Sequence, residues 1–174
     1  MQGAWSDGLM WYIILFFVTL LLDQVTKIIS HATDVNITII DKILILYFDE
    51  NPGASFGMLS DKPWAQTFFF VLTVIVLVAG VVFLIWKKPK SKWLLTSMAL
   101  MFSGTIGNFI DRIAFKFVRD FILLPPFKFN CNVADICLCV GAAMLIFYVL
   151  FLDSDPVFKV GKKNKEKEVK KTDE

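Results

Sequence analysis

The sequence predicts an all-α membrane protein, a bundle of four transmembrane helices with a small extracytoplasmic β-hairpin or β-sheet and both termini in the cytoplasm. The first observation is composition, since 56% of the 174 residues are hydrophobic, against roughly 45–50% apolar in a soluble domain. The second is a set of four apolar stretches, each close to the ~20 residues that cross a hydrocarbon core. They lie near residues 9–30, 64–86, 93–113 and 133–152. The third is the distribution of lysine along the chain.

Lysine gathers in two segments, which should therefore face the cytoplasm. The link between the second and third stretches has four lysines, and the tail has seven between Lys159 and Lys171. The loop of residues 31–63 has two lysines and five acidic residues, which suits the outer face. We therefore expect a membrane domain over residues 1–155 and a charged cytoplasmic tail over residues 156–174, disordered beside anionic lipid.

The first apolar stretch is expected to be a retained helix, not a cleaved signal peptide. The segment Met1–Met10 has Asp7 and no Lys or Arg, and no small-x-small cleavage site follows the apolar stretch. Measured outward from Trp11, a rise of 1.5 Å per residue places Asp23 about 18 Å along, with Lys27 one turn further on the same face. Charges inside a membrane usually mark function, although a self-neutralising pair with an outward-reaching lysine also explains them.

The loop of residues 31–63 is predicted to contain a β-hairpin followed by a tight turn. Two apolar segments, Ile37–Ile39 and Ile43–Tyr47, flank a short charged turn. Two strands alone are marginally stable in water, so we expect the membrane surface to support the hairpin. It leads into Asn51–Gly57, where one proline and two glycines predict an irregular turn.

The second and third stretches differ in polarity. The second carries no charge and is bounded by tryptophans, which suits a lipid-facing strut without chemistry. The third places Asn108, Asp111 and Arg112 near its outer end, with Asn108 and Arg112 on one face. Gly104 and Gly107 precede them and would let a neighbouring helix approach closely, although packing alone could explain these glycines.

Two aspartates lie near the start of the fourth stretch. Asp120 lies in the loop of residues 114–132 next to Arg119, and a surface ion pair between them is one interpretation. Adjacent residues on an extended segment point to opposite sides, which leaves Asp120 free to face inward. Asn132 and Asp135 have the spacing of a helix capping box, which explains Asn132 well. A carboxylate among apolar neighbours favours a functional role for Asp135.

The sequence argues against several kinds of site. Cys131, Cys137 and Cys139 lack a paired spacing, so we predict packing residues instead of a disulfide framework or zinc site. The single histidine, His31, excludes metal motifs that need two histidines. We expect no metal site and no nucleic-acid partner.

Five segments in this order carry a resemblance to a known family. They are Asp23–Lys27, Asn51–Gly57, Gly104–Arg112, Val118–Ile122 and Asn132–Asp135. Together they closely resemble the lipoprotein signal peptidases, the signal peptidase II family of bacteria, and the resemblance runs from the first span to the fourth. It implies that Asp120 and Asp135 are the catalytic dyad of a membrane aspartic protease. Matching positions would shape the site and hold the substrate or the dyad, namely Asp23, Lys27, Asn51, Gly53, Asn108, Arg112 and Asn132.

The resemblance also implies a substrate and a location. The family cuts diacylglyceryl-modified prolipoproteins just before the lipidated cysteine and so removes the signal peptide. It acts in the bacterial cell membrane at the extracytoplasmic face, uses a water and no cofactor, and is inhibited by the cyclic peptide globomycin. We accordingly expect prolipoprotein substrates, surrounding membrane lipid, sensitivity to globomycin-type inhibitors and a monomeric protein.

The chain departs from the family pattern at four positions. Ser103 replaces a usual glycine, Ser55 a common alanine, Arg119 an apolar residue and Cys131 a usual phenylalanine. None is a proposed catalytic residue. They bear on the packing around the dyad and on inhibitor sensitivity.

Three other interpretations stay open on the sequence alone. One is a purely structural membrane protein, although such a protein would not need this many costly polar groups. A Ser-Lys peptidase would use Lys27 with Ser30 or Ser55. A small transporter or channel subunit would use Asp23, Lys27 and Arg112, but its sites should lie near the midplane between repeated halves. The charges of this chain gather toward one face, and no internal repeat is visible.

Overall fold

The structure is a computed structural model that describes residues 3–53, 62 and 64–152. The described chain runs through α1 (Gly3–Thr33), β1 (Asn36–Ile40), β2 (Leu44–Asn51), α2 (Ala65–Lys87), α3 (Lys92–Phe115), β3 (Val118–Leu124), the 3-10 turn η2 (Pro125–Phe127), β4 (Phe129–Cys131), α4 (Val133–Phe147) and the π-helical η3 (Tyr148–Leu152). Within this part of the chain, four helical segments are long and apolar enough to cross a membrane: Gly8–Thr33, Ala65–Lys87, Lys92–Phe115 and Val133–Leu152. Four spans with a small antiparallel sheet are thus confirmed. The predicted tail and Ser55 lie outside the described residues.

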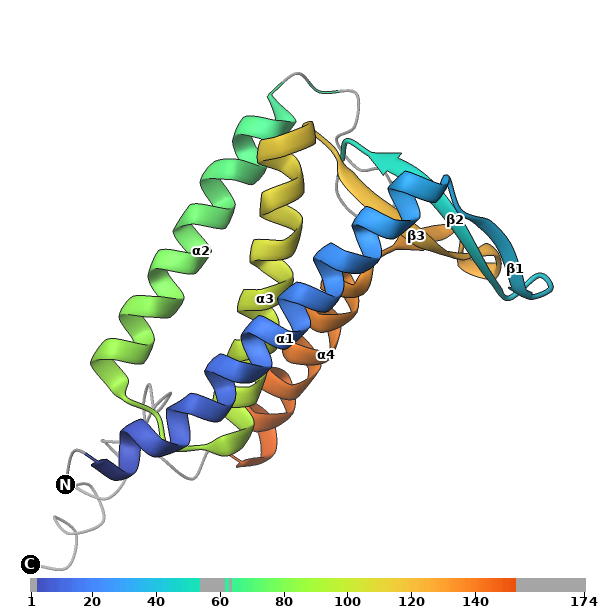
Figure 1. Cartoon of the computed structure of the whole chain (residues 1–174). Coiled ribbons are helices and arrows are strands. Elements are labelled where there is room, and N and C mark those ends of the chain that lie inside the picture. The colour runs from blue at the N-terminus through green and yellow to red at the C-terminus, as the bar shows by residue number, and fades with distance from the viewer. Residues whose placement is uncertain (1–2, 54–61, 63, 153–174) are drawn as a thin grey trace, which may run out of the picture.

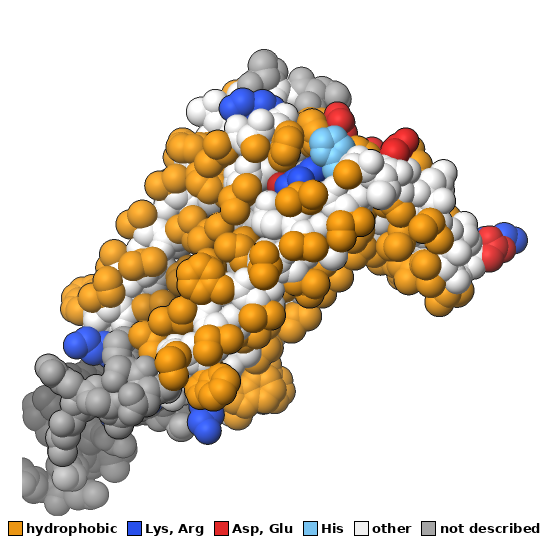
Figure 2. Space-filling view, in the orientation of Figure 1, with side chains coloured by type: hydrophobic (Ala, Val, Ile, Leu, Met, Phe, Trp, Pro, Cys, Tyr) orange, Lys and Arg blue, Asp and Glu red, His pale blue; other side chains and the backbone are white. Residues whose placement is uncertain are grey.

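The helices pack around α3. This helix buries nine residues, whereas α2 buries only Ala65 and lies at one edge of the bundle (Figure 1). Figure 2 shows hydrophobic side chains covering the helices on this face, with charged side chains gathered toward the two ends. Such a surface is suited to a hydrocarbon environment.

Close helix contacts occur where the sequence places glycines. A Cβ atom built on Gly104 would collide with the carbonyl oxygen of Ala134 in α4. A Cβ on Gly107 would lie 2.5 Å from Asp23 Oδ2 of α1 and 3.2 Å from the Ala134 Cβ. The glycines therefore allow α1, α3 and α4 to converge around Asp23, which confirms the predicted close approach.

The outer loops form one antiparallel sheet with the order β1-β2-β3-β4. The predicted hairpin is confirmed as β1 and β2, and the second outer loop adds β3 and β4 to it. Residues Val118–Phe121 at the start of β3 are buried, whereas all of β1 is exposed. The His31 ring at the end of α1 stacks on Phe48 of β2, with ring centroids 4.9 Å apart. The sheet is thereby joined to the bundle at its β3 side and projects away at its β1 side (Figure 1).

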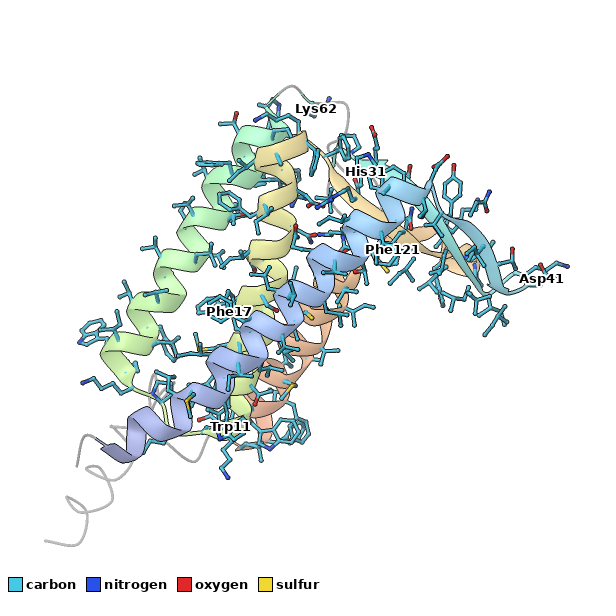
Figure 3. The ribbon with its side chains drawn as sticks, in the orientation of Figure 1. Trp11, Phe17, His31, Asp41, Lys62 and Phe121 are labelled. Atoms are coloured by element: carbon cyan, nitrogen blue, oxygen red, sulfur yellow. The ribbon has the colours of Figure 1, made fainter. Side chains whose placement is uncertain are left out.

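Figure 3 shows which labelled residues lie at each end of the helix bundle. Trp11 lies toward one end, whereas His31, Lys62 and Phe121 lie toward the other, and Asp41 is at the tip of the hairpin. The residue next to Phe121 is Asp120, so the candidate site is at the end of the bundle that carries the sheet.

Candidate active site

A polar cleft of about 280 Å³ lies between α2, α3, α4 and the sheet. Its polar lining includes Asn51, Asn108, Arg112, Asp120, Asn130 and Asp135. The opposite wall comes from α2, through Phe69, Leu72, Thr73 and Val76. The second span is therefore more than the lipid-facing strut that its lack of charge suggested, because one of its faces closes the cleft.

The two predicted dyad residues meet in this cleft and share one hydrogen-bond partner, Asn132. Asp120 Oδ1 accepts a hydrogen bond from Asn132 Nδ2 at 2.6 Å, and Asp120 Oδ2 accepts one from Asn51 Nδ2 at 2.9 Å. Asp135 Oδ1 accepts from Asn108 Nδ2 at 2.8 Å, and Asp135 Oδ2 accepts from the Asn132 backbone N–H at 3.2 Å. Asn132 thus bonds to both acids. Segments far apart in the sequence hold the two carboxyl groups at one cleft.

Asp120 has an unusual acidity for a carboxyl group. Burial first, and then the neighbouring charge of Asp135, raise the pKa of Asp120 from its ordinary value near 3.8 to about 7. Hydrogen bonds from Asn51 and Asn132 act in the opposite direction because they stabilise the anion. Asp120 therefore titrates close to neutral pH, as a general acid or base working there requires.

The start of α4 explains how Asp135 is held. Asn132 Oδ1 accepts from the Asp135 N–H at 3.0 Å, while the Asp135 carboxylate bonds back to Asn132, which confirms the predicted capping box. Asp23 Oδ1 of α1 accepts from the Ala134 N–H at 2.8 Å. Two N–H groups of the first helical turn are thereby satisfied by side chains, one of them from another span.

Lys27 supports the site from inside the bundle. Its side chain is fully buried, and its Nζ lies 3.0 Å from Asp23 Oδ2 and 3.4 Å from Asp111 Oδ2. The predicted Asp23–Lys27 pair is present, but the interpretation in which the lysine reaches outward is wrong, because acids on α1 and α3 surround it. Lys27 also donates to Asn108 Oδ1 at 2.9 Å, which leaves the Asn108 amide NH₂ directed at Asp135.

Arg119 does not pair with Asp120. Its Nη2 lies 2.6 Å from Asp111 Oδ1, and its backbone N–H donates to Asp111 Oδ2 at 3.0 Å. The same guanidinium donates to Gln24 Oε1 at 3.2 Å and lies 4.6 Å from the Phe115 ring centroid. The predicted divergence of adjacent side chains is confirmed, whereas the surface ion pair is wrong. The sequence interpretation gives Asp111 no role. Its position next to Arg112 within an apolar span was nevertheless a signal of a functional acid.

Arg112 holds the turn that follows β2. Its Nη2 donates to the Gly53 carbonyl oxygen at 3.1 Å, and its Cζ lies 4.7 Å from the Phe69 ring centroid of α2. The Gly53 N–H donates to Asn51 Oδ1 at 3.0 Å. These contacts orient Asn51 so that its amide NH₂ reaches Asp120. Every site residue predicted from the sequence therefore belongs to one connected polar cluster.

Two of the departures have a structural explanation. Ser103 accepts a hydrogen bond from Thr19 Oγ1 at 2.7 Å and so joins α3 to α1, a contact that a glycine could not make. Cys131 is buried, and burial raises the pKa of its thiol to about 12, which agrees with a packing role. Among the residues that the structure describes, no group of three or more His, Cys, Asp or Glu is placed to hold a metal ion.

Comparison with known proteins agrees with the motifs. The family model for signal peptidase II matches residues 15–151. A lipoprotein signal peptidase of Bacillus velezensis is 37% identical over 150 residues, which cover 82% of this chain and 95% of the relative. A lipoprotein signal peptidase of Anoxybacillus flavithermus is 35% identical over 147 residues, covering 81% of this chain and 86% of the relative.

Two solved structures described as bacterial membrane enzymes share the fold. One has a TM-score of 0.75 and covers 87% of this chain, the other a TM-score of 0.70 over 82%, each at 34% identity and over 94% of its own chain. The four spans and these matches define the class, a multi-pass membrane protease of bacterial type. The chain belongs to the signal peptidase II family, whose matched relatives are named lipoprotein signal peptidases.

Proposed function

We propose that this protein is an aspartic endopeptidase that removes signal peptides from diacylglyceryl-modified prolipoproteins by cutting before the lipidated cysteine. Asp120 and Asp135 are its catalytic dyad. The observation that carries the proposal is the placement of both acids at one cleft, where Asn132 bonds to each. Family membership supports the substrate class.

The mechanism follows from the closeness of two acids. Two neighbouring carboxyl groups ionise together only at high energy, so one keeps its proton and the pair titrates as a unit. The ionised partner removes a proton from a bound water while the protonated partner polarises the scissile carbonyl, which gives a tetrahedral intermediate without an acyl enzyme. Its collapse transfers a proton to the leaving amine. Each carboxyl group accepts hydrogen bonds from two N–H donors, so these contacts do not distinguish the protonated acid from the ionised one. The shared proton is therefore assigned to the pair.

The arrangement suits a substrate held in a membrane. The lysine-rich link between α2 and α3 favours the cytoplasm, and β3, the strand that carries Asp120, lies toward the opposite end of the bundle (Figure 1). This supports cytoplasmic termini and an extracytoplasmic active site. The division into a peptidase domain of residues 1–155 and a tail of residues 156–174 stays a prediction from the sequence. Arg112 and Asn108 bind peptide carbonyl groups near the cut, and cyclic peptides of the globomycin type occupy the same cleft. The protein acts as a monomer in lipid.

A second cavity, of about 230 Å³, continues this cleft toward the other end of the bundle. It lies between α2 and α3, with Leu145 of α4 also in its lining, and shares Val76 and Thr105 with the polar cleft. Apart from Thr105, its lining residues are apolar or glycine, including Phe83, Met98 and Phe102. The apolar segment of a signal peptide that enters between these helices would place its outer end at the dyad.

The proposal predicts cleavage that depends on lipidation. Purified protein in detergent should cut a diacylglyceryl-modified precursor just before the modified cysteine, as read by mass spectrometry. The matched precursor with serine in place of that cysteine should stay intact. Failure to cut the lipidated precursor would contradict the proposal.

The same assay tests the Ser-Lys alternative. Ser30 Oγ donates to the Lys27 carbonyl oxygen at 3.0 Å, and the Lys27 ammonium is committed to Asp23, Asp111 and Asn108. Ser30 is therefore not arranged as a nucleophile with a lysine base. Ser30→Ala and Ser55→Ala should both keep the wild-type rate, whereas loss of turnover in either variant would favour the serine mechanism.

Asn51 is expected to set the upper pH limit of activity. Because the pKa of Asp120 is about 7 and one proton must stay on the pair, kcat/KM should fall as pH rises above about 7. Asn51→Leu removes a donor that stabilises the anion, so the pKa of Asp120 rises and this limb moves about one pH unit upward. Asn36→Leu, the same exchange on exposed β1, should leave the profile unshifted. A limb that stays in place in Asn51→Leu would contradict the role given to this bond.

A further inference from the structure

Two buried polar atoms in the cleft have no hydrogen-bond partner within the described part of the chain. One is Arg112 Nε, a donor, and the other is Asn130 Oδ1, an acceptor. The third such atom among the described residues, Gln66 Oε1, belongs to a residue that does not line this cleft. Buried donors and acceptors are nearly always paired, so two unpaired atoms of opposite kind at one cleft indicate a ligand that bonds to both.

The strand geometry directs Asn130 at the site. Asn130 lies in β4, two residues before Asn132, and the backbone between them continues extended to the start of α4. Side chains two residues apart on a strand share one face, so Asn130 lies on the face that carries the Asn132 bond to Asp120. The Asn130 amide NH₂ donates to the Tyr47 carbonyl oxygen at 3.5 Å. That bond directs Nδ2 at β2 and leaves Oδ1 as the unpaired acceptor.

We propose that Asn130 is a specificity-determining residue that binds the substrate main chain, its Oδ1 accepting a peptide N–H beside the scissile bond. This inference rests on the proposed peptidase function and adds a residue to it. An extended peptide presents C=O and N–H groups in alternation, which matches the donor at Arg112 and the acceptor at Asn130. A helical segment has its N–H groups occupied internally, so this acceptor selects a substrate that is unwound around the cut.

The first test separates binding from chemistry. Asn130→Leu removes the acceptor at similar volume, and KM for a lipidated precursor peptide should rise about five-fold with little change in kcat. Asn36→Leu on the exposed strand β1 should change neither constant. If Asn130→Leu lowers the fraction of folded protein, Asn130→Ala provides the same comparison of KM and kcat.

The second test identifies the bond itself. A series of lipidated precursor peptides carries an ester oxygen in place of one main-chain N–H at a time, the scissile amide excepted. At one position the ester should raise the wild-type KM about five-fold and leave the KM of Asn130→Leu unchanged, because that bond is already lost. An equal effect of every ester on both proteins, or an unchanged KM in Asn130→Leu, would overturn the inference. A wild-type protein that leaves the lipidated precursor intact would overturn the peptidase function, and this inference with it.

Discussion

Replacing either dyad acid by asparagine is expected to lower turnover of a lipidated precursor about 10²- to 10⁴-fold, the range associated with loss of general acid–base catalysis. Asparagine keeps the shape and one acceptor oxygen, but it cannot take a proton from water or return one to the leaving amine. Asp120→Asn and Asp135→Asn should therefore both leave the precursor uncut. The measurement is the initial rate of cleavage by purified protein at matched concentration.

Asp41→Asn is the matched control, since it makes the same exchange on an exposed turn at the tip of the hairpin. It should cut at the wild-type rate. Thermal unfolding in detergent should show that all three variants are folded. A folded Asp120→Asn or Asp135→Asn protein with normal turnover would remove that residue from the mechanism.

The largest loss of stability is expected from Asp111→Asn. The side chain of Asp111 is fully buried, accepts hydrogen bonds from the Arg119 backbone N–H and guanidinium, and forms an ion pair with the Lys27 ammonium. Removing its charge leaves one buried cation without compensation, and breaking a buried ion pair from one side costs about 3–5 kcal/mol. The free energy of unfolding, measured by denaturant titration in mixed micelles, should fall by about that amount. The exposed exchange Asp41→Asn should change it by less than about 0.5 kcal/mol.

A double-mutant cycle separates charge balance from the loss of contacts. Asp23, Lys27, Asp111 and Arg119 together carry two negative and two positive charges. Asp111→Asn combined with Arg119→Met removes one of each sign, so Lys27 keeps Asp23 as its partner. The double variant should therefore be more stable than Asp111→Asn alone. Additive losses would contradict the view that uncompensated charge causes the effect.

The spans and the capping box could be predicted because their signals are local. Hydropathy over about 20 residues defines a span, and the Asn132–Asp135 spacing lies within one helical turn. The motif order of the family then indicated the dyad. What the motifs did not provide was the pattern of partners, since Asn51 and Asp120 are 69 residues apart and meet only through the pairing of β2 with β3.

Two features could not be predicted from the sequence, for physical reasons. The absence of charge in α2 indicates apolar surroundings but does not distinguish lipid from the wall of a cleft, which Phe69 and Thr73 form. For Arg119 the sequence offered a neighbouring acid, yet the strand turns the two side chains apart and the partner lies on α3. Asn130 could have been found by following strand alternation back from Asn132, had β4 been expected.

One residue, Asn132, both caps α4 and joins the two acids, through its side-chain amide to Asp120 and its backbone N–H to the Asp135 carboxylate. Fraying of the first turn of α4 would break the bond that Asn132 accepts there and separate the carboxyl groups in the same event. Under the proposed mechanism, catalytic activity therefore requires an ordered first turn of α4. Amide hydrogen exchange at Asp135 should report the fraction of molecules able to react.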